Sequence, residues 1–229
     1  MSITIKWFGH GTYGLEVGVH RIIVDPFFAP HNPVAPVSVD EIEADFILQT
    51  HGHGDHITDT VALAKRTGAL VISNFEICGW LGKQGYENTH GLNIGGGYQF
   101  DFGRAEMTLA LHSSGLPDGA YGGNPGGFLV SAEDRDVYLA GDTAVFSDMA
   151  LIGDVGLDLA VLPIGDNFTM GGEASLAAIK YLRPKVVIPG HYNTWPLVAQ
   201  DANAWEGRVR EVTNAEPVVL DVGGTYTVP

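Results

Sequence analysis

The sequence predicts an α+β fold in which two β-sheets pack face to face and helices cover their outer surfaces. Short apolar or alternating runs typical of strands outnumber helical segments, and many of these runs follow one another directly. The helical segments come after groups of strands, which suits helices packed outside a pair of sheets. No linker-like stretch divides the 229 residues, so we expect one domain over residues 1–229.

The first half of the chain predicts strands that alternate with turns and then with helices. The segment 58–67 has an aspartate near its start and Lys65 and Arg66 near its end, as the helix dipole favours. We expect strands over residues 3–8, 13–17, 21–24, 45–50 and 69–73, and helices over residues 58–67 and 75–83.

The second half repeats this mixture. Residues 113–127 are rich in glycine and proline and predict a loop over a site. We expect strands over residues 98–102, 105–111, 127–131, 136–140, 157–163 and 185–189, with closing strands within 217–228, and helices over 146–152, 173–182 and 197–212.

Composition narrows the classes of partner. The formal net charge of −15 disfavours long nucleic acids and anionic membranes, because nothing would offset phosphate repulsion. The single cysteine, Cys78, cannot form an intrachain disulfide and is better explained as a small core residue than as a nucleophile. Because no signal-peptide pattern or membrane-length apolar run occurs, we expect a cytoplasmic protein. Because the net charge disfavours long nucleic acids and membranes, we expect its substrate to be a small molecule.

A cluster of metal-ligand side chains follows the apolar run 45–50. Three histidines and one aspartate fall within six residues, in Thr50-His51-Gly52-His53-Gly54-Asp55-His56. Imidazole and carboxylate bind zinc and similar first-row divalent metals. His51 and His53 alternate along an extended segment and the last two ligands come from the following turn, so the two sets could hold two neighbouring ions.

Four other apolar runs also end in a residue that can bind metal. These residues are Asp25, His112, Asp142 and His191. Each alone is a weak signal, because a lone histidine or aspartate after a strand is more often a turn or cap residue. Together with the histidine cluster they indicate one site at a shared sheet edge.

In order, these motifs resemble those of the metallo-β-lactamase superfamily: an early aspartate, H-x-H-x-D-H, a histidine, an aspartate and a histidine. The resemblance spans Asp25 to His191, nearly the whole chain. Within the superfamily, the segments 7–11, 25–27, 50–56, 140–143 and 163–171 look like those of the UPF0173 metal-dependent hydrolases, a branch similar to the ascorbate-6-phosphate lactonases. The resemblance implies a four-layer αββα sandwich with its site at one edge of the two sheets.

The resemblance also implies a binuclear hydrolase and assigns roles to residues. It implies that one ion is bound by His51, His53 and His112, the other by Asp55, His56 and His191, and that Asp142 bridges them. Asp25 would hydrogen-bond near the ligand loop and orient it. Two such ions activate a bridging water and polarise a carbonyl or phosphoryl oxygen, so no protein nucleophile is required.

Other residues are candidates for catalysis or for substrate binding. Asp55 would handle protons as well as bind metal, and His10, in a glycine-flanked turn, would bind substrate or act as an acid unless its role is structural. Asp166, Asn167 and Thr169 follow an apolar run and are candidates for the substrate pocket, with helix capping as the alternative for Thr169.

Several alternatives stay open at the level of sequence. The substrate could be a lactone, another small ester or a phosphodiester. A mononuclear iron dioxygenase of the same fold, which retains H-x-H-x-D-H, is a different class, and a non-catalytic metal-binding module is a third. Zinc is the first candidate for the ions, and manganese, iron, cobalt and nickel suit the same ligands. A homo-oligomer is also compatible with the resemblance.

Overall fold

The computed structural model describes residues 2–229, and its strands form two seven-stranded mixed sheets. The first sheet has the order β14-β1-β2-β3-β4-β5-β6. Its strands are β1 (Ile3–Trp7), β2 (Tyr13–Val17), β3 (His20–Val24), β4 (Phe46–Leu48), β5 (Leu70–Asn74), β6 (Thr89–Leu92) and β14 (Thr225–Thr227). β1, β2 and β3 form an antiparallel meander, and β3 to β6 pair in parallel.

The second sheet has the order β13-β12-β11-β10-β9-β8-β7. Its strands are β7 (Gly97–Phe100), β8 (Gly103–Leu109), β9 (Gly126–Ala132), β10 (Arg135–Leu139), β11 (Leu159–Pro163), β12 (Val186–Gly190) and β13 (Glu216–Pro217). β7 to β10 are antiparallel, and β10 to β13 are parallel. The two sheets therefore share one plan, antiparallel strands that lead into parallel ones.

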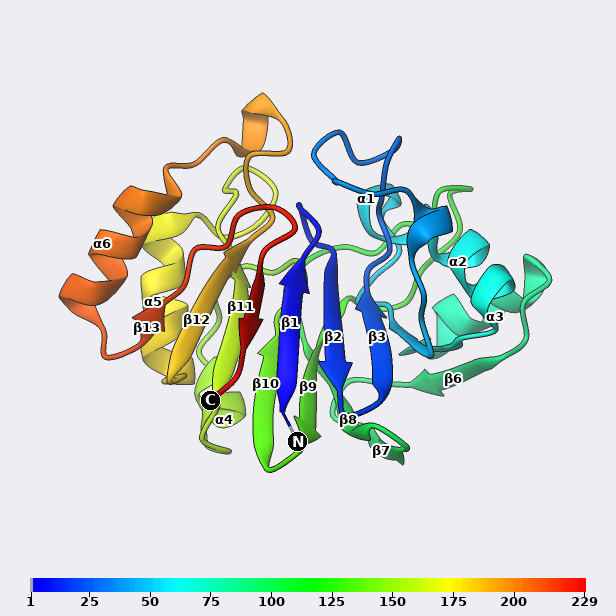
Figure 1. Ribbon diagram of the computed structural model, residues 1–229, viewed down its shortest axis with the longest axis horizontal. Helices are drawn as coiled ribbons and strands as arrows, with labels where there is room; N and C mark the ends of the chain where they lie inside the picture. Colours follow the sequence, from blue (N-terminus) through cyan, green and yellow to red (C-terminus); the bar gives the residue numbers. More distant parts are fainter. Residues whose placement is uncertain (1) are drawn as a thin grey trace.

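The main hydrophobic core lies between the sheets. In β1 the buried side chains alternate, Ile3, Ile5 and Trp7, because only one face of this strand meets the other sheet. In β11 and β12 every residue is buried, as expected for strands covered on both faces. Figure 1 shows β1, β2 and β3 lying over β8, β9 and β10, so the sheets form the two inner layers.

Helices form the outer layers. α2 (Thr60–Thr67) and α3 (Phe75–Lys83) cover the first sheet through a second apolar cluster that includes Leu63, Ile77 and Leu81. α5 (Gly172–Leu182) and α6 (Ala202–Val212) lie at the opposite side (Figure 1). Two short helices, α1 (Gly54–Ile57) and α4 (Met149–Gly153), complete the set, with 3-10 turns at Val39–Glu41 and Pro196–Val198.

This arrangement confirms the predicted α+β sandwich and corrects three of its details. β6 was not predicted, because Thr89–Leu92 is a short, mostly polar edge strand with little apolar signal. The expected helix 197–212 is divided: a 3-10 turn comes first, and α6 begins after Asp201, whose side chain accepts from the Ala204 amide. The expected closing strands 217–228 belong to different sheets, since β13 pairs with β12 and β14 with β1.

The topology brings several strand ends to one edge of the sandwich. β1, β3 and β4 run in one direction within the first sheet, and β8, β10 and β12 do so within the second. The segments that follow these strands carry His10, Asp25, the histidine cluster, His112, Asp142 and His191. Parallel strands end at the same sheet edge, so ligands far apart in sequence become neighbours.

Candidate metal centre

The histidine cluster occupies the turn between β4 and α1. His53 is the N-cap residue of α1 and has an extended backbone, whereas Asp55 and His56 lie in the helix. His51 and His56 are fully buried, and Asp55 keeps 31% of its side chain exposed. The change from extended chain to helix separates His51 and His53 from Asp55 and His56, as the sequence predicts.

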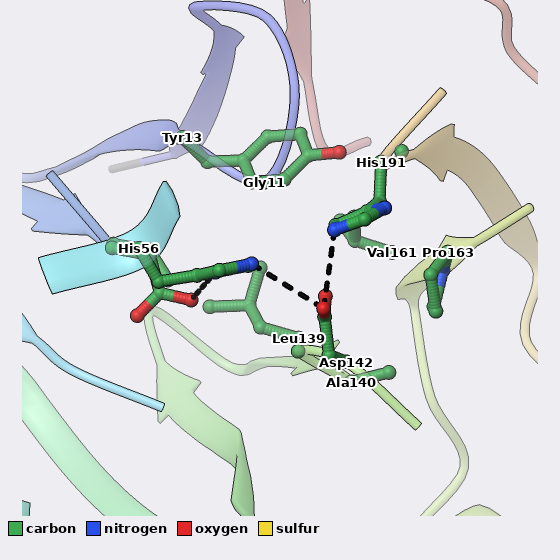
Figure 2. Close-up of a pocket in the computed structure, with 13 residues that line it drawn as sticks. Gly11, Tyr13, His56, Leu139, Ala140, Asp142, Val161, Pro163 and His191 are labelled. Atoms are coloured by element: carbon green, nitrogen blue, oxygen red, sulfur yellow. Dashed lines mark hydrogen bonds and ion pairs between the residues drawn. The ribbon is translucent and has the colours of Figure 1, made fainter. Parts of the chain in front are cut away.

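Asp142 lies close to four histidines of the site, and Figure 2 shows it between His56 and His191. Its Oδ2 atom is 3.1 Å from Nε2 of His191, 3.4 Å from Nε2 of His56, 3.5 Å from Nε2 of His112 and 3.9 Å from Nε2 of His51. One carboxylate oxygen is therefore close to histidines from both sheets. The side chain is only 4% exposed, so its charge is balanced inside the protein and not by solvent.

The remaining candidate ligand atoms form three groups, two of which share no residue. His51, His53 and His112 make one group, and Asp55, His56 and His191, together with His10, make another. The third is Asp25 with His51 and His56, in which Asp25 accepts a hydrogen bond from Nδ1 of His56. The atoms within each group lie within 4.8 Å of one another. The first two groups contain the two sets that the resemblance implies, and His10 is an addition to the second. The assignment of these residues to two ions stays a prediction.

The histidine nitrogens fit a tetrahedral metal ion. Nδ1 of His53 lies 3.1 Å from Nε2 of His51 and 3.2 Å from Nε2 of His112. Two nitrogen ligands of tetrahedral zinc are about 3.3 Å apart, given bonds of about 2.0–2.1 Å. Nε2 of His56 and of His191 are buried without a hydrogen bond among the described residues, which is costly unless a ligand satisfies them. The residues present therefore fit divalent metal.

Asp25 orients the ligand loop. It has a left-handed backbone (φ 48°) and is 1% exposed. Its carboxylate accepts from the Thr50 amide at 2.7 Å, the Thr50 hydroxyl at 2.6 Å and Nδ1 of His56 at 2.8 Å. Because the Thr50 hydroxyl donates to Asp25, it accepts from Nδ1 of His51 at 2.9 Å. Both histidines thus turn Nε2 towards Asp142, as metal ligands require.

The charges of the site are strongly coupled. Burial alone would raise the pKa of Asp142, but His191 and His56 hold it well below its usual value. Burial likewise opposes protonation of His191, yet Asp142 raises the pKa of His191 to about 9. The imidazolium of His191 thus balances the carboxylate of Asp142, as the positive charge of a bound metal would.

The triad His51, His53 and His112 behaves differently. Burial lowers the pKa of each of these histidines, and it is the largest cause in all three. At neutral pH these imidazoles are uncharged and already in the form that binds metal.

His10 lies beneath Asp55. It is fully buried, has φ 54°, and its carbonyl accepts from the indole of Trp7 and the amide of His191. Its Nε2 donates to Oδ2 of Asp55 at 2.9 Å, and its Nδ1 accepts from the Thr194 hydroxyl at 2.7 Å. Burial, followed by the neighbouring His191, lowers the pKa of His10 to about 4, so this histidine is neutral.

A cavity of about 530 Å³ opens onto the ligands, and we call it the outer cavity. Besides ligand side chains it is lined by Ser113, Phe168, Trp195 and Leu197. Phe168 and Leu197 are 54% and 67% exposed, which is unusual for large apolar residues and typical of a binding wall.

The other predicted pocket residues lie beside this wall. Asp166 and Asn167 are exposed and have left-handed backbones, and Thr169 donates to the carbonyl of Met170. None of the three is among the described residues that line the outer cavity, so their role in substrate binding stays a prediction.

Some contributors carry no recognisable sequence signal. Thr194 and Phe168 lie on loops and Leu197 in the 3-10 turn Pro196–Val198, and only the fold brings them to the site. Ser113 begins the segment 113–127 that the sequence predicts as a loop over the site. Trp195 lies four residues after His191 in the chain and also lines the outer cavity.

Comparisons with known proteins agree with this geometry. A family model described as "Beta-lactamase superfamily domain" matches residues 20–192. A UPF0173 metal-dependent hydrolase of Shouchella clausii is 47% identical over 227 residues, covering 96% of this chain and 98% of that protein. One of Thermus thermophilus is 49% identical over 209 residues, covering 91% and 92%.

A solved structure gives the same result. A metallo hydrolase from the archaeon Ignicoccus hospitalis superposes with a TM-score of 0.89 at 34% identity, covering 100% of this chain and 99% of that one. Fold and site together define a metal-dependent hydrolase of the metallo-β-lactamase superfamily. Within that superfamily, the chain belongs to the UPF0173 family.

Proposed function

We propose that this enzyme is a binuclear hydrolase that cleaves a small carboxylic ester or lactone. The observation that carries the proposal is the position of Asp142, whose Oδ2 lies within 3.9 Å of Nε2 atoms from both ligand groups. A pair of bound divalent ions would lower the pKa of a water molecule between them and polarise the substrate's acyl oxygen.

The protein's own residues hold and orient the site. His51, His53 and His112 would hold one ion, and Asp55, His56 and His191 the other. Asp142 would join them, while Asp25 and Thr50 fix the rings of His56 and His51. Zinc is our first choice, with manganese, iron, cobalt and nickel as alternatives that the same ligands accept.

Asp55 and His10 would serve proton transfer. Asp55 faces the outer cavity. Burial would raise the pKa of its carboxyl, but the hydrogen bond from His10 and the nearby His191, whose Nε2 lies 3.7 Å from Oδ2, lower it. Neutral His10 holds the Asp55 carboxylate through a hydrogen bond from Nε2. His10 is not among the described residues that line the outer cavity. We therefore assign proton movement at the substrate to Asp55, and its positioning to His10.

The lining of the outer cavity favours an acyl substrate over a phosphodiester. Among its described lining residues there is no lysine or arginine, and Phe168, Trp195 and Leu197 make one wall apolar. Phosphate groups are commonly held by arginine or lysine, whereas the body of an ester or lactone is neutral and gains from apolar contact.

The second ligand group argues against a mononuclear iron dioxygenase of the same fold. A mononuclear iron site needs two histidines and one carboxylate, and His51, His112 and Asp142 already supply them. Asp55, His56 and His191 would then be a group without a role. This group is our reason to propose two ions.

Hydrolysis assays with chosen substrates test the proposal. The protein is stripped by a chelator, reloaded with zinc or manganese, and assayed with a γ-lactone, p-nitrophenyl acetate and bis-p-nitrophenyl phosphate. We expect turnover of the lactone or acetate that disappears on chelation and returns on reloading. Metal-dependent turnover of the phosphodiester alone would refute the acyl assignment, and oxygen uptake with an iron-loaded protein would refute hydrolysis.

A further inference from the structure

A second, much smaller cavity lies on the inner side of the ligands, between the two sheets. It has a volume of about 20 Å³, enough for one water molecule. We call it the inner cavity. Figure 2 shows Tyr13 of β2 reaching over it towards His191, with His56 and Asp142 on its other side.

Four buried polar atoms of residues that line the inner cavity lack a hydrogen bond among the described residues. Nε2 of His56 and Nε2 of His191 lie near Asp142, which leaves the Tyr13 hydroxyl and Nδ1 of His191 to be explained. Tyr13 is 4% exposed and His191 3%, so bulk water does not satisfy either group. Unsatisfied buried polar groups are rare, and each calls for an explanation.

His191 differs from the other buried histidine ligands in this respect. Nδ1 of His51 bonds to Thr50, and Nδ1 of His56 bonds to Asp25. A histidine that binds metal nearly always donates its other ring nitrogen to a carboxylate, a carbonyl or a water. His191 therefore needs a partner for Nδ1 that the described side chains do not supply directly.

Gly190 leaves space for the Tyr13 hydroxyl next to His191. A Cβ atom added at residue 190 would lie 1.9 Å from Oη of Tyr13 and 3.1 Å from its Cζ. A side chain at this position and the tyrosine hydroxyl exclude each other. Glycine at position 190, immediately before His191, therefore allows the Tyr13 hydroxyl to lie at this place.

We propose that the Tyr13 hydroxyl positions His191 for metal binding, through one water molecule held in the inner cavity. Nδ1–H of His191 donates to that water, and the water bonds to Oη of Tyr13. Burial raises the pKa of Tyr13, so the phenol keeps its proton and remains both donor and acceptor. The inference rests on the proposed metal site and assigns Tyr13 as a positioning residue for one of its two ions.

Tyr13→Phe tests the inference, with Tyr138→Phe as its matched control. Tyr138 is also fully buried, on β10, but it does not line the inner cavity. Each variant removes one buried hydroxyl and nothing else. The readouts are the two stepwise zinc dissociation constants, by competition with a chelating dye, and the Tm of the metal-free protein.

We expect Tyr13→Phe to weaken one of the two zinc sites by about 10- to 100-fold, the usual effect of losing a partner of a ligand. Tyr138→Phe should leave both constants within about twofold of the wild type. Equal constants in the two variants would overturn the inference, whatever happens to the Tm.

Gly190→Ala provides a second, independent test. Its Cβ would displace the Tyr13 hydroxyl, so it should weaken the same zinc site. In the Tyr13→Phe background the closest ring atom is Cζ, and the further loss caused by Gly190→Ala should be much smaller. Fully additive losses in the double variant would show that the residues act separately and would contradict the proposal.

The proposed function and this inference fail in different ways. A wild-type protein that binds fewer than two zinc ions would refute the binuclear site, and with it the basis of the inference. A wild type with two ions, and a Tyr13→Phe variant with unchanged constants, would refute only the role of Tyr13.

Discussion

Nδ1 of His56 lies 2.8 Å from Oδ2 of Asp25, a contact that ties the end of β3 to the helix after β4. Both side chains are about 1% exposed. Burial raises the pKa of Asp25, while the hydrogen bond and charge of His56 oppose that rise. The pair fixes which nitrogen of His56 faces Asp142, so we infer that Asp25 acts on metal binding through His56.

Asp25→Asn should therefore weaken metal binding without unfolding the protein. Asparagine tolerates the left-handed backbone at this position but removes the charge that favours Nδ1–H on His56. We expect a loss of about 10- to 100-fold in metal affinity. Equilibrium dialysis measures it, and an unchanged affinity would contradict the positioning role.

Removing a ligand should abolish activity. For His51→Ala and Asp142→Ala we expect kcat/KM to fall by about a thousandfold or more, since a metal centre supplies several kcal/mol of transition-state stabilisation. Far-ultraviolet circular dichroism should stay near that of the wild type, because both residues follow the strands and lie outside them. Asp101→Ala, at an exposed turn, is the control. A wild-type rate in either ligand variant would refute the mechanism.

His10→Asn should separate positioning from binding. Asparagine accepts the φ of 54° but cannot reach both Asp55 and Thr194. We expect kcat to fall by about 10- to 100-fold with KM little changed, because His10 acts on Asp55 and lies outside the outer cavity. A large rise in KM with unchanged kcat would instead make His10 a substrate-binding residue.

The two metal sites should differ in pH dependence. Asp142 raises the pKa of His191 to about 9, so metal must displace a proton from it at pH 7, and affinity should rise as pH rises from 7 to 9. The rise should be about tenfold per pH unit for each proton released. The histidines of the other site have lowered pKa values, so its affinity should stay nearly flat. Calorimetric titrations in two buffers measure the protons, and parallel pH profiles would contradict this assignment.

Cys78→Ser should leave hydrolysis unchanged. The thiol is buried in α3 near the carbonyl of Ser73, and burial raises its pKa, so it is a poor nucleophile. Steady-state assays should give kcat and KM within about twofold of the wild type. Complete loss of turnover with a normal Tm would revive a thiol nucleophile.

Much of the site could be predicted because its chemistry follows strand ends. Asp25, Asp142 and His191 each come directly after apolar runs, and parallel strands bring such positions to one edge. The sequence could not predict the role of Tyr13, which has the alternating burial of an ordinary core residue in β2. Its importance depends on a gap that Gly190 leaves on the other sheet.

The sequence also could not predict that Phe168 lines the outer cavity, because this depends on the direction of its side chain in the folded chain. The sequence predicts that Asp166 and Asn167 line the substrate pocket, because they are polar and follow an apolar run. In the structure their neighbour Phe168 lines the outer cavity. Local sequence does not report which side chain of a turn points inward. The strand β6 and the separation of β13 from β14 also depend on long-range pairing, which local patterns do not encode.

The number of metal ions bound per chain tests the central claim most directly. The protein is stripped, reloaded with zinc, freed of unbound metal by gel filtration and analysed by elemental mass spectrometry, with activity followed at each loading. We expect activity to rise until about two equivalents are bound, as in two-metal hydrolases. Full activity at one equivalent, with no second ion retained, would contradict a site bridged by Asp142.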